Sequence, residues 1–319
     1  MTEVSPLVSI IIPAYNNRRT ICDAVDSALA QTHPRCEIVV VDDGSTDGTR
    51  ELLQERYGDR IQIIHQANAG PAAARNAGLW RAQGDYVNYL DGDDLLASTK
   101  IARCLEVIDQ QQDSVIVYTG FQFVAADGVT PLPAETPPAP SGDIFCDLLL
   151  GSPITIHAPL VPRQALIDVG GMNEDLQQSE DRDLWVRLAQ EHDFLYVDEP
   201  LTMYRLHDDA LHVDVQQRLE GRLMALQLAR YYPKRQACYD DATYDHLVAG
   251  THHQLAVVYW QHGARVLARG QLRSAQALAP SAMRRVLLAM SYAFPARAVT
   301  WLERVIGVVK GRRQSGTAG

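Results

Sequence analysis

Residues 84–96 have the sequence GDYVNYLDGDDLL, in which a segment typical of a β-strand runs directly into three aspartates. Gly92 separates Asp91 from Asp93, and a glycine lets the backbone turn sharply and come close to a ligand. The two flanking carboxylates can therefore point at one hard cation, since Mg²⁺ is usually held by one or two carboxylates, water and substrate phosphate oxygens. The alternative is an acidic turn that closes the strand, because Asp and Gly are common turn residues.

Two strands predicted earlier in the chain place this turn within a larger sheet. Residues 7–12 and 37–41 are almost continuously apolar and rich in β-branched side chains, as expected for strands buried on both faces of a parallel sheet. Apolar residues at helical spacing separate these strands, and such alternation predicts an α/β fold with a mostly parallel central sheet flanked by helices. Ligands bind such sheets outside the carboxyl ends of the strands, where Tyr15, Asp43 and Asp91 fall.

Two further groups of charged residues are candidates for chemistry. Pro71 suits the first turn of a helix, which places Arg75 on a short helix of small residues beside the sheet. A single arginine is commonly a solvated surface charge, but one directed toward a carboxylate-rich pocket can pair with a diphosphate. Glu180 and Asp181 begin another predicted helix. The helix dipole favours carboxylates there, and a carboxylate held in this way can also accept a proton from a substrate hydroxyl.

The last third of the chain has a different, helical pattern. Residues 252–279 resemble a helical hairpin of tetratricopeptide type, with small residues where two helices would pack. We therefore expect two domains, residues 1–214 and residues 215–319. The tail that contains residues 301–309 is amphipathic and flanked by arginines, so it can lie on an anionic membrane surface or pack on its own domain.

Composition limits the classes of function. The 319 residues are 46% hydrophobic and 21% charged, as in an ordinary globular protein, and the formal net charge of -10 argues against a nucleic-acid partner. Five scattered cysteines without a Cys-x-x-Cys pair fit a reducing compartment and argue against a disulfide framework. The chain lacks the basic-then-apolar start of a signal peptide and any apolar run near the ~18 residues of a membrane span. We expect a cytoplasmic protein whose tail can contact the inner face of the membrane.

Five segments together are more specific than any one motif. Residues 8–17, 37–48, 68–78, 84–96 and 170–188 resemble the family-two inverting glycosyltransferases with the GT-A fold, in the expected order and spacing. The resemblance covers roughly the first two-thirds of the chain. It implies a GT-A glycosyltransferase domain followed by a helical C-terminal extension with a basic amphipathic tail.

The resemblance implies an activity and a donor site. A sugar would move from a nucleotide-sugar donor, commonly a UDP-sugar, to an acceptor hydroxyl with inversion at the anomeric carbon. The acceptor would be a glycan, a lipid-linked precursor or another precursor of a cell-surface polysaccharide. Pro13, Ala14 and Tyr15 would line the base pocket, Asp43 would hydrogen-bond the base, and Arg75 would face the nucleotide.

A divalent metal is also implied, either Mg²⁺ or Mn²⁺. Asp91 and Asp93 resemble the DxD motif of the family, with Asp91 toward the ribose and the metal and Asp93 on the metal itself. His207 lies in a Tyr-Arg-x-His segment, where it would contact the metal or the diphosphate. A single histidine is more commonly a solvated loop residue. Asp94 is expected to be a structural cap.

The second acidic pair matches the position of the catalytic base in the family, a role that we assign to Asp181. Glu180 and Arg182 would then lie on the acceptor side. Arg182 stands where members often carry an aromatic residue, and Met172 replaces a frequent phenylalanine. Because both departures fall near the acceptor, they leave the identity of the acceptor open.

Other classes of protein fit the sequence less well. A dinucleotide-dependent dehydrogenase needs Gly-x-Gly-x-x-Gly after the first strand, where this chain has Pro-Ala-Tyr-Asn, and no P-loop motif is present. The remaining alternative is a non-catalytic nucleotide-sugar-binding or scaffold protein of the same fold. The joint presence of Asp43, Asp91, Asp93 and Asp181 argues against it, because an inactive site has no physical need for all four.

Overall fold

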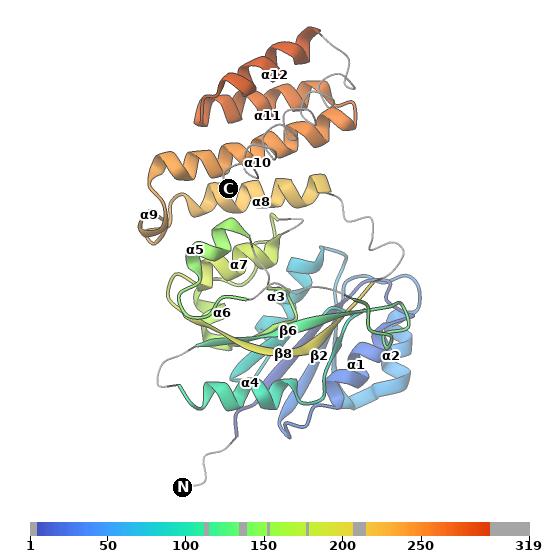
Figure 1. Ribbon diagram of the computed structural model, residues 1–319. Coiled ribbons are helices and arrows are strands. Elements are labelled where there is room, and N and C mark those ends of the chain that lie inside the picture. Colours follow the sequence, from blue (N-terminus) through green and yellow to red (C-terminus); the bar gives the residue numbers. More distant parts are fainter. Residues whose placement is uncertain are drawn as a thin grey trace. The chain divides into compact units, whose positions relative to one another are not determined.

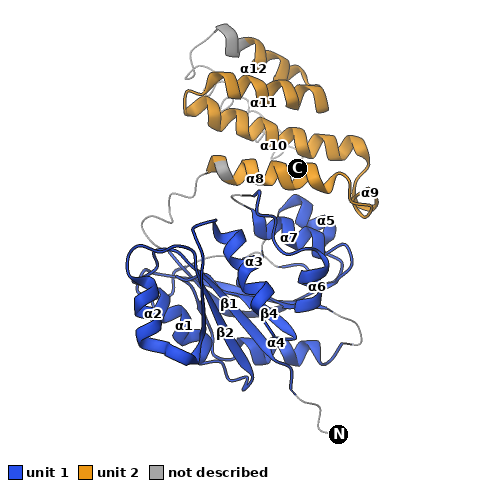
Figure 2. Cartoon of the chain, turned by 180° about the vertical axis from the view of Figure 1, so that it is seen from behind, with its two compact units in different colours: residues 1–213 blue, residues 214–319 orange. Residues whose placement is uncertain are grey.

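A computed structural model describes residues 5–111, 115–133, 139–151, 154–176, 179–206 and 215–293. The chain divides into two compact units, Met1–Val213 and Asp214–Gly319, which are coloured separately in Figure 2. His207 and the tail from residue 294 onward lie outside the described residues, so the expectations for both stay predictions.

The first unit contains a sheet with the strand order β3-β2-β1-β4-β7-β6-β8-β5 in its described part. Its strands are β1 (Val8–Ala14), β2 (Cys36–Asp42), β3 (Gln62–His65), β4 (Tyr86–Tyr89), β5 (Leu95–Leu96), β6 (Ile116–Val124), β7 (Pro159–Pro162) and β8 (Phe194–Arg205). Strands β3, β2, β1 and β4 are parallel, whereas β7 runs antiparallel to β4 and β6, and β8 is parallel to β6 and antiparallel to β5. The predicted α/β fold is confirmed, with a parallel half and a mixed half.

Helices surround this sheet (Figure 1). They are α1 (Ile21–Leu29), α2 (Thr49–Tyr57), the 3-10 turn η1 (Gly58–Arg60), α3 (Pro71–Arg81), α4 (Lys100–Ile108), α5 (Phe145–Leu150), α6 (Arg163–Asp168) and α7 (Glu180–Leu188). Helix α3 begins at Pro71, as expected, because a proline lacks the N–H that would be unpaired in the first turn.

The two faces of β1 pack against different helices. Val8, Ile10 and Ile12 are fully buried in a core shared with α1 and α4, and each such isoleucine contributes about 1.5–3 kcal/mol by its burial. Ile11 points to the other face, since side chains alternate along a strand. There α3 packs so closely that a Cβ atom on Gly78 would lie 2.4 Å from Ile11 Cγ2. The small residues of α3 thus hold Arg75 near the end of β1.

The second unit is helical in its described part. Its helices are α8 (Val215–Ala229), α9 (Arg235–Cys238), α10 (Asp241–Gln261), α11 (Arg265–Leu278) and α12 (Ala282–Ala293). Helices α10 and α11 form a hairpin that includes the expected one, although α10 begins at Asp241 and not near residue 252. Ala249, Ala275 and Ala279 pack together in it. Among the described helices, none combines the length and apolarity that a membrane span requires.

Candidate active site

A pocket of about 440 Å³ lies at the carboxyl ends of β1 and β4, beside the start of α3. It brings together seven residues that the sequence had singled out, namely Pro13, Ala14, Tyr15, Asp43, Arg75, Asp91 and Asp93, along with Asn17, Asn68, Gly70, Pro71, Ala74 and Gly92. Because β1, β2 and β4 are parallel neighbours, the polar residues that follow them meet at one edge of the sheet.

Asp43 lines the pocket and is almost fully buried. Its Oδ1 accepts hydrogen bonds from Gln66 Nε2 at 2.8 Å and from Ala69 N at 2.9 Å, and its Oδ2 accepts one from Gly70 N at 2.9 Å. An ionised carboxylate has about four acceptor positions, so these three bonds leave one for a ligand. Gln66 was missed from the sequence because nothing in the local pattern distinguishes it from a surface residue.

Arg75 lies between two carboxylates from distant parts of the chain. Its Nη2 is 2.5 Å from Asp91 Oδ1 and its Nη1 is 2.9 Å from Glu180 Oε1. Burial favours the neutral form of Arg75, but the charges and hydrogen bonds of Asp91 and Glu180 outweigh burial and raise its pKa. Arg75 therefore stays a cation and fixes the orientation of Asp91. Glu180, expected on the acceptor side, is the second partner of Arg75.

The acidic turn leaves little space around Gly92. A Cβ atom there would lie 3.1 Å from Pro13 O and 3.2 Å from the Asn17 side chain. Burial, followed by the neighbouring carboxylates of Asp94 and Asp91, raises the pKa of Asp93 to about 7. Crowded carboxylates of this kind are stabilised by a cation, because an opposite charge favours their ionised form. The residues at this turn thus fit a divalent metal.

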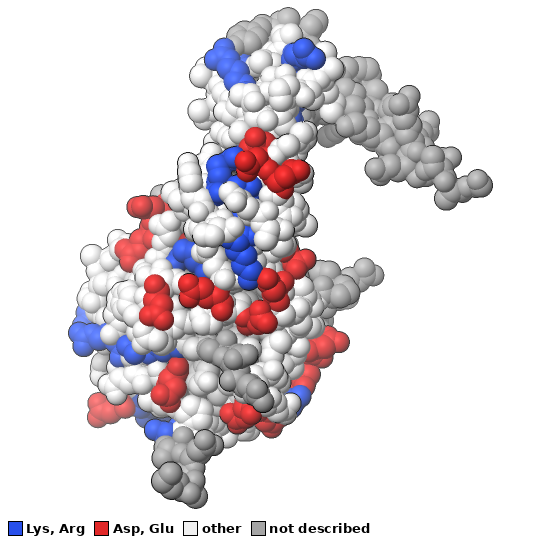
Figure 3. All heavy atoms as spheres, turned by 90° about the vertical axis from the view of Figure 1, so that its left-hand side faces the viewer, with Lys and Arg blue, Asp and Glu red and all other residues white. Residues whose placement is uncertain are grey.

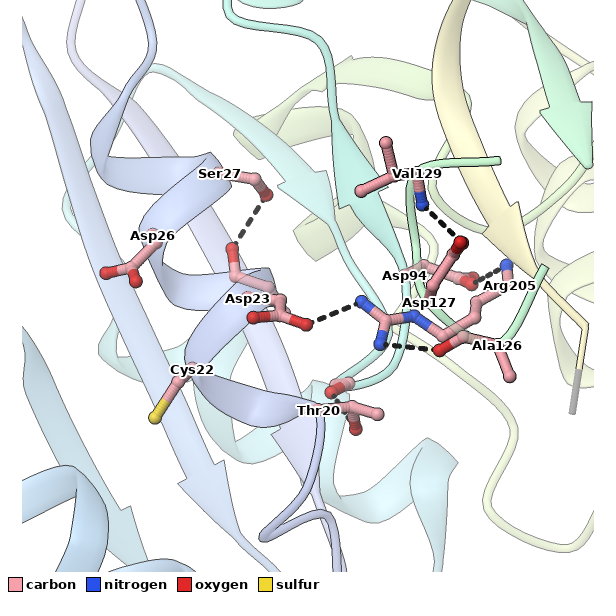
Figure 4. A network of polar contacts seen from close by, with 12 residues as sticks. Thr20, Cys22, Asp23, Asp26, Ser27, Asp94, Ala126, Asp127, Val129 and Arg205 are labelled. Carbon is pink, nitrogen blue, oxygen red and sulfur yellow. Dashed lines mark hydrogen bonds and ion pairs between the residues drawn. The ribbon is translucent and has the colours of Figure 1, made fainter. Parts of the chain in front are cut away.

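Asp94 connects the acidic turn to the end of β8. Its Oδ1 accepts a hydrogen bond of 2.8 Å from Arg205 N, which joins the turn to the last residue of β8. The Arg205 side chain continues to α1, where Nη2 lies 2.9 Å from Asp23 Oδ2 (Figure 4). Asp94 is 2% exposed and Arg205 is 4% exposed. These contacts fix the position of the turn relative to two other elements.

Asp181 lies in the first turn of α7 and is partly exposed. Burial, followed by the charge of Glu180, raises the pKa of Asp181 to about 6. Burial and the carboxylates of Asp94, Asp91, Asp93 and Asp181 together raise the pKa of Tyr204 to about 12. Arg75 joins the two acidic groups, because it pairs with Asp91 of the turn and with Glu180, the residue before Asp181.

Arg182 has its side chain inside the fold. Its Nη2 donates to Leu148 O at 2.8 Å and to Leu149 O at 2.7 Å, at the end of α5. The carbonyls at a helix end lack partners within the helix, so Arg182 ties α5 to α7. Its backbone N–H donates to Asp181 Oδ1 at 2.7 Å. Arg182 thus supports the helix start that carries Asp181.

The structure also adds a histidine that the sequence analysis missed. His157 is fully buried, and it can offer one ligand atom that lies within 4.8 Å of an oxygen of Asp91 and an oxygen of Asp94. In the sequence it is a single histidine in an apolar stretch, 63 positions after Asp94, so no local spacing relates it to the acidic turn.

Comparison with known proteins places the chain in a family. Residues 9–153 match the sequence model described as Glycosyl transferase family 2. Over 215 residues the chain is 36% identical to the putative teichuronic acid biosynthesis glycosyltransferase TuaG of Bacillus subtilis, covering 66% of this chain and 83% of that protein. The chain belongs to the family-two glycosyltransferases. This glycosyltransferase spans smaller shares of other relatives, such as 21% of the chondroitin synthase of Pasteurella multocida, to which it is 33% identical over 206 residues (64% of this chain).

Solved structures share the fold of this glycosyltransferase. TarS 1-349 of S. aureus in complex with UDP-GlcNAc has a TM-score of 0.63 and 19% identity, and the match covers 90% of this chain and 87% of that one. The mannosyltransferase PcManGT of Pyrobaculum calidifontis, in complex with GDP-Man and Mn²⁺, has a TM-score of 0.58 and 18% identity, with 99% and 84% covered. The predicted GT-A fold is thereby confirmed.

Proposed function

We propose that this glycosyltransferase is an inverting, metal-dependent enzyme that moves a sugar from a UDP-sugar to a hydroxyl of a cell-surface polysaccharide precursor. One observation carries the proposal. A pocket large enough for a nucleotide is lined by Asp43, Arg75, Asp91 and Asp93, and Arg75 joins Asp91 to Glu180, the residue before Asp181. A donor site and a candidate base thus share one edge of the sheet.

The uracil base would lie at the Asp43 end of the pocket. Uracil presents an N–H between two carbonyl groups, and the remaining acceptor position of Asp43 suits that N–H. Pro13, Ala14 and Tyr15 would pack against the base, since all three line the same pocket. The UDP-GlcNAc complex of TarS, a protein of the same fold, supports this choice of donor.

The diphosphate would lie beside the acidic turn. We assign Asp91 and Asp93 as ligands of Mg²⁺ or Mn²⁺, with Asp91 also toward the ribose and His207 as a further ligand. When bound, the metal ion would neutralise the charge that develops on the departing nucleoside diphosphate. Arg75 contributes a buried cation at the same wall of the pocket and holds Asp91 in place. The Mn²⁺ complex of PcManGT, a protein of the same fold, supports the choice of a divalent metal.

Asp181 would act as the general base. With a pKa of about 6 it is mostly ionised at neutral pH, and a base with a pKa near the working pH is suited to accept the proton of a hydroxyl as it attacks. Attack from the face opposite the leaving diphosphate inverts the anomeric carbon. An α-linked donor would therefore give a β-glycoside.

The acceptor would approach from the side of α7, next to Glu180 and the helix start that Arg182 supports from inside the fold. The name of the B. subtilis relative, a putative teichuronic acid biosynthesis glycosyltransferase, supports a polysaccharide or lipid-linked acceptor. On the face of the first unit seen in Figure 3, acidic and basic side chains of the described residues are interspersed. With a net charge of -10, this distribution supports a glycan partner over a nucleic acid. The tail from residue 301 is our candidate for peripheral membrane contact.

The test is a panel of sugar nucleotides, each incubated with the protein and Mn²⁺ or Mg²⁺. We expect one or a few UDP-sugars to raise the melting temperature in a metal-dependent way, because a ligand of the folded state stabilises it. The same donors should release UDP when acceptor extracts are added. Absence of metal-dependent UDP release with every common UDP-sugar would contradict the proposal and favour the non-catalytic alternative.

A further inference from the structure

His157 is held at a defined place below the acidic turn. It lies two residues before β7, and Asn88 of β4 donates from Nδ2 to His157 O at 3.1 Å and to Pro159 O at 2.7 Å. Asn88 and His157 are both fully buried. Because Asn88 comes three residues before Asp91, the strand that leads into the turn also fixes the backbone of His157.

The imidazole of His157 is directed at the carboxylate of Asp94. His157 Nδ1 lies 3.2 Å from Asp94 Oδ2, and the ring centroid is 5.7 Å from that of Tyr204. Neither ring nitrogen has a well-aligned hydrogen-bond partner within the described part of the chain. A buried polar atom without a partner costs about 1–3 kcal/mol, so the ring is expected to gain a partner in the working state. Asp94 is the nearest candidate.

The lining of the pocket separates the proposed metal ligands from the residues that hold them in place. Asp91 and Asp93 line the pocket, whereas Asp94 and His157 do not, and both of the latter are closed off from solvent. A substrate phosphate in the pocket can therefore share a cation with Asp91 and Asp93. Asp94 already uses Oδ1 to accept from Arg205 N, which leaves Oδ2 for His157.

We propose that His157 is a positioning residue for the metal-binding turn. Its Nδ1–H donates to Asp94 Oδ2, and Asp94 in turn holds the backbone that carries Asp91 and Asp93. The inference rests on the proposed function, since it concerns the same metal and donor. Groups that orient metal ligands typically change metal affinity about 10–100-fold when they are removed.

Two amide variants test which ring nitrogen matters. His157→Asn places an N–H near the position of Nδ1, whereas His157→Gln places one near Nε2. Affinity for Mn²⁺ with UDP would be measured by calorimetry, and the ligand-dependent rise in melting temperature by thermal unfolding. We expect His157→Asn to bind within a few fold of wild type, and His157→Gln and His157→Ala to bind about 10–100-fold more weakly.

His33→Asn is the matched control for loss of a buried histidine. His33 is 8% exposed, and its Nε2 lies 2.8 Å from Pro6 O in another part of the unit. We expect this variant to lower the melting temperature without ligand and to leave the Mn²⁺ and UDP affinity unchanged. A general loss of stability would thus be separated from a loss of positioning.

A double variant tests the link to Asp94. If His157 acts through Asp94, His157→Gln combined with Asp94→Ala should bind no more weakly than Asp94→Ala alone, because the effects of coupled residues are not additive. Additive losses, equal weakening in the Asn and Gln variants, or wild-type affinity in all variants would overturn the inference. If wild-type protein binds no UDP in the presence of Mn²⁺, the proposed function fails first and the inference fails with it.

Discussion

Asp181 and Asp93 are two partly exposed carboxylates with different proposed tasks. Asp93 lines the pocket, at the wall where we propose the diphosphate, whereas Asp181 lies in the first turn of α7. We expect Asp181→Asn to lower kcat by about 10²–10⁴-fold, the usual contribution of a general base, while UDP and Mn²⁺ still bind. Asp93→Asn should abolish both transfer and metal-dependent binding. Each variant serves as the control for the other, and an equal loss of donor binding in both would contradict the division of tasks.

The ionisation of Asp181 predicts how the rate depends on pH. Burial and Glu180 raise the pKa of Asp181 to about 6, so the ionised form that accepts a proton predominates above that pH. At saturating metal and donor, we expect kcat to be constant near pH 7.5 and to fall about tenfold per pH unit well below pH 6. Saturating metal keeps Asp93 ionised during the titration. A rate that stays constant from pH 8 to pH 5 would exclude Asp181 as the base.

At the level of single elements, the close contact between α3 and β1 sets the position of Arg75. In Gly78→Ala the new Cβ atom would lie 2.4 Å from Ile11 Cγ2, so strand and helix must move apart. We expect the free energy of unfolding to fall by about 1–3 kcal/mol, as for other overpacked cores.

Gly270→Ala is the control, because no atom outside its own helix backbone and chain neighbours lies within 4 Å of its Cβ position in α11. Replacing a glycine inside a helix there should raise stability by up to about 1 kcal/mol. Thermal and urea unfolding measure both changes, and equal effects would contradict this account.

The strands and helices that carry each residue also explain which parts of the site could be predicted from the sequence. Asp43 and Asp91 each follow an apolar strand directly, so the strand pattern and the rule for ligand positions were enough to bring them together. The pairing of Arg75 with Glu180 joins residues 105 positions apart, and no periodicity records such a contact. The position of His157 could not be predicted from a local pattern either. The antiparallel pairing of β7 with β4 and β6, in the mixed half of the sheet, places His157 beneath the turn. Local patterns predicted the groups that line the pocket, and tertiary pairing decides the groups behind them.

On the scale of the whole molecule, the core described for the sheet is built from residues of the first unit alone, between Val8 and Val197. The pocket is likewise lined by residues 13 to 93. We therefore expect a chain ending at residue 213 to fold and to bind UDP with Mn²⁺ at the affinity of the full chain. Calorimetry on both forms measures this, with Asp93→Asn in each as the negative control.

We expect the second unit to bring the enzyme to a membrane surface. Between residues 265 and 293 it carries five arginines and no acidic residue, and each basic residue near an anionic surface contributes about 1 kcal/mol to binding. We expect the full chain to sediment with vesicles that contain phosphatidylserine and to be released by high salt, because screening weakens such contacts. The chain ending at residue 213 should stay in the supernatant. Loss of UDP binding on truncation would instead mean that the second unit completes the donor site, and equal sedimentation of the two forms would assign the membrane contact to the first unit.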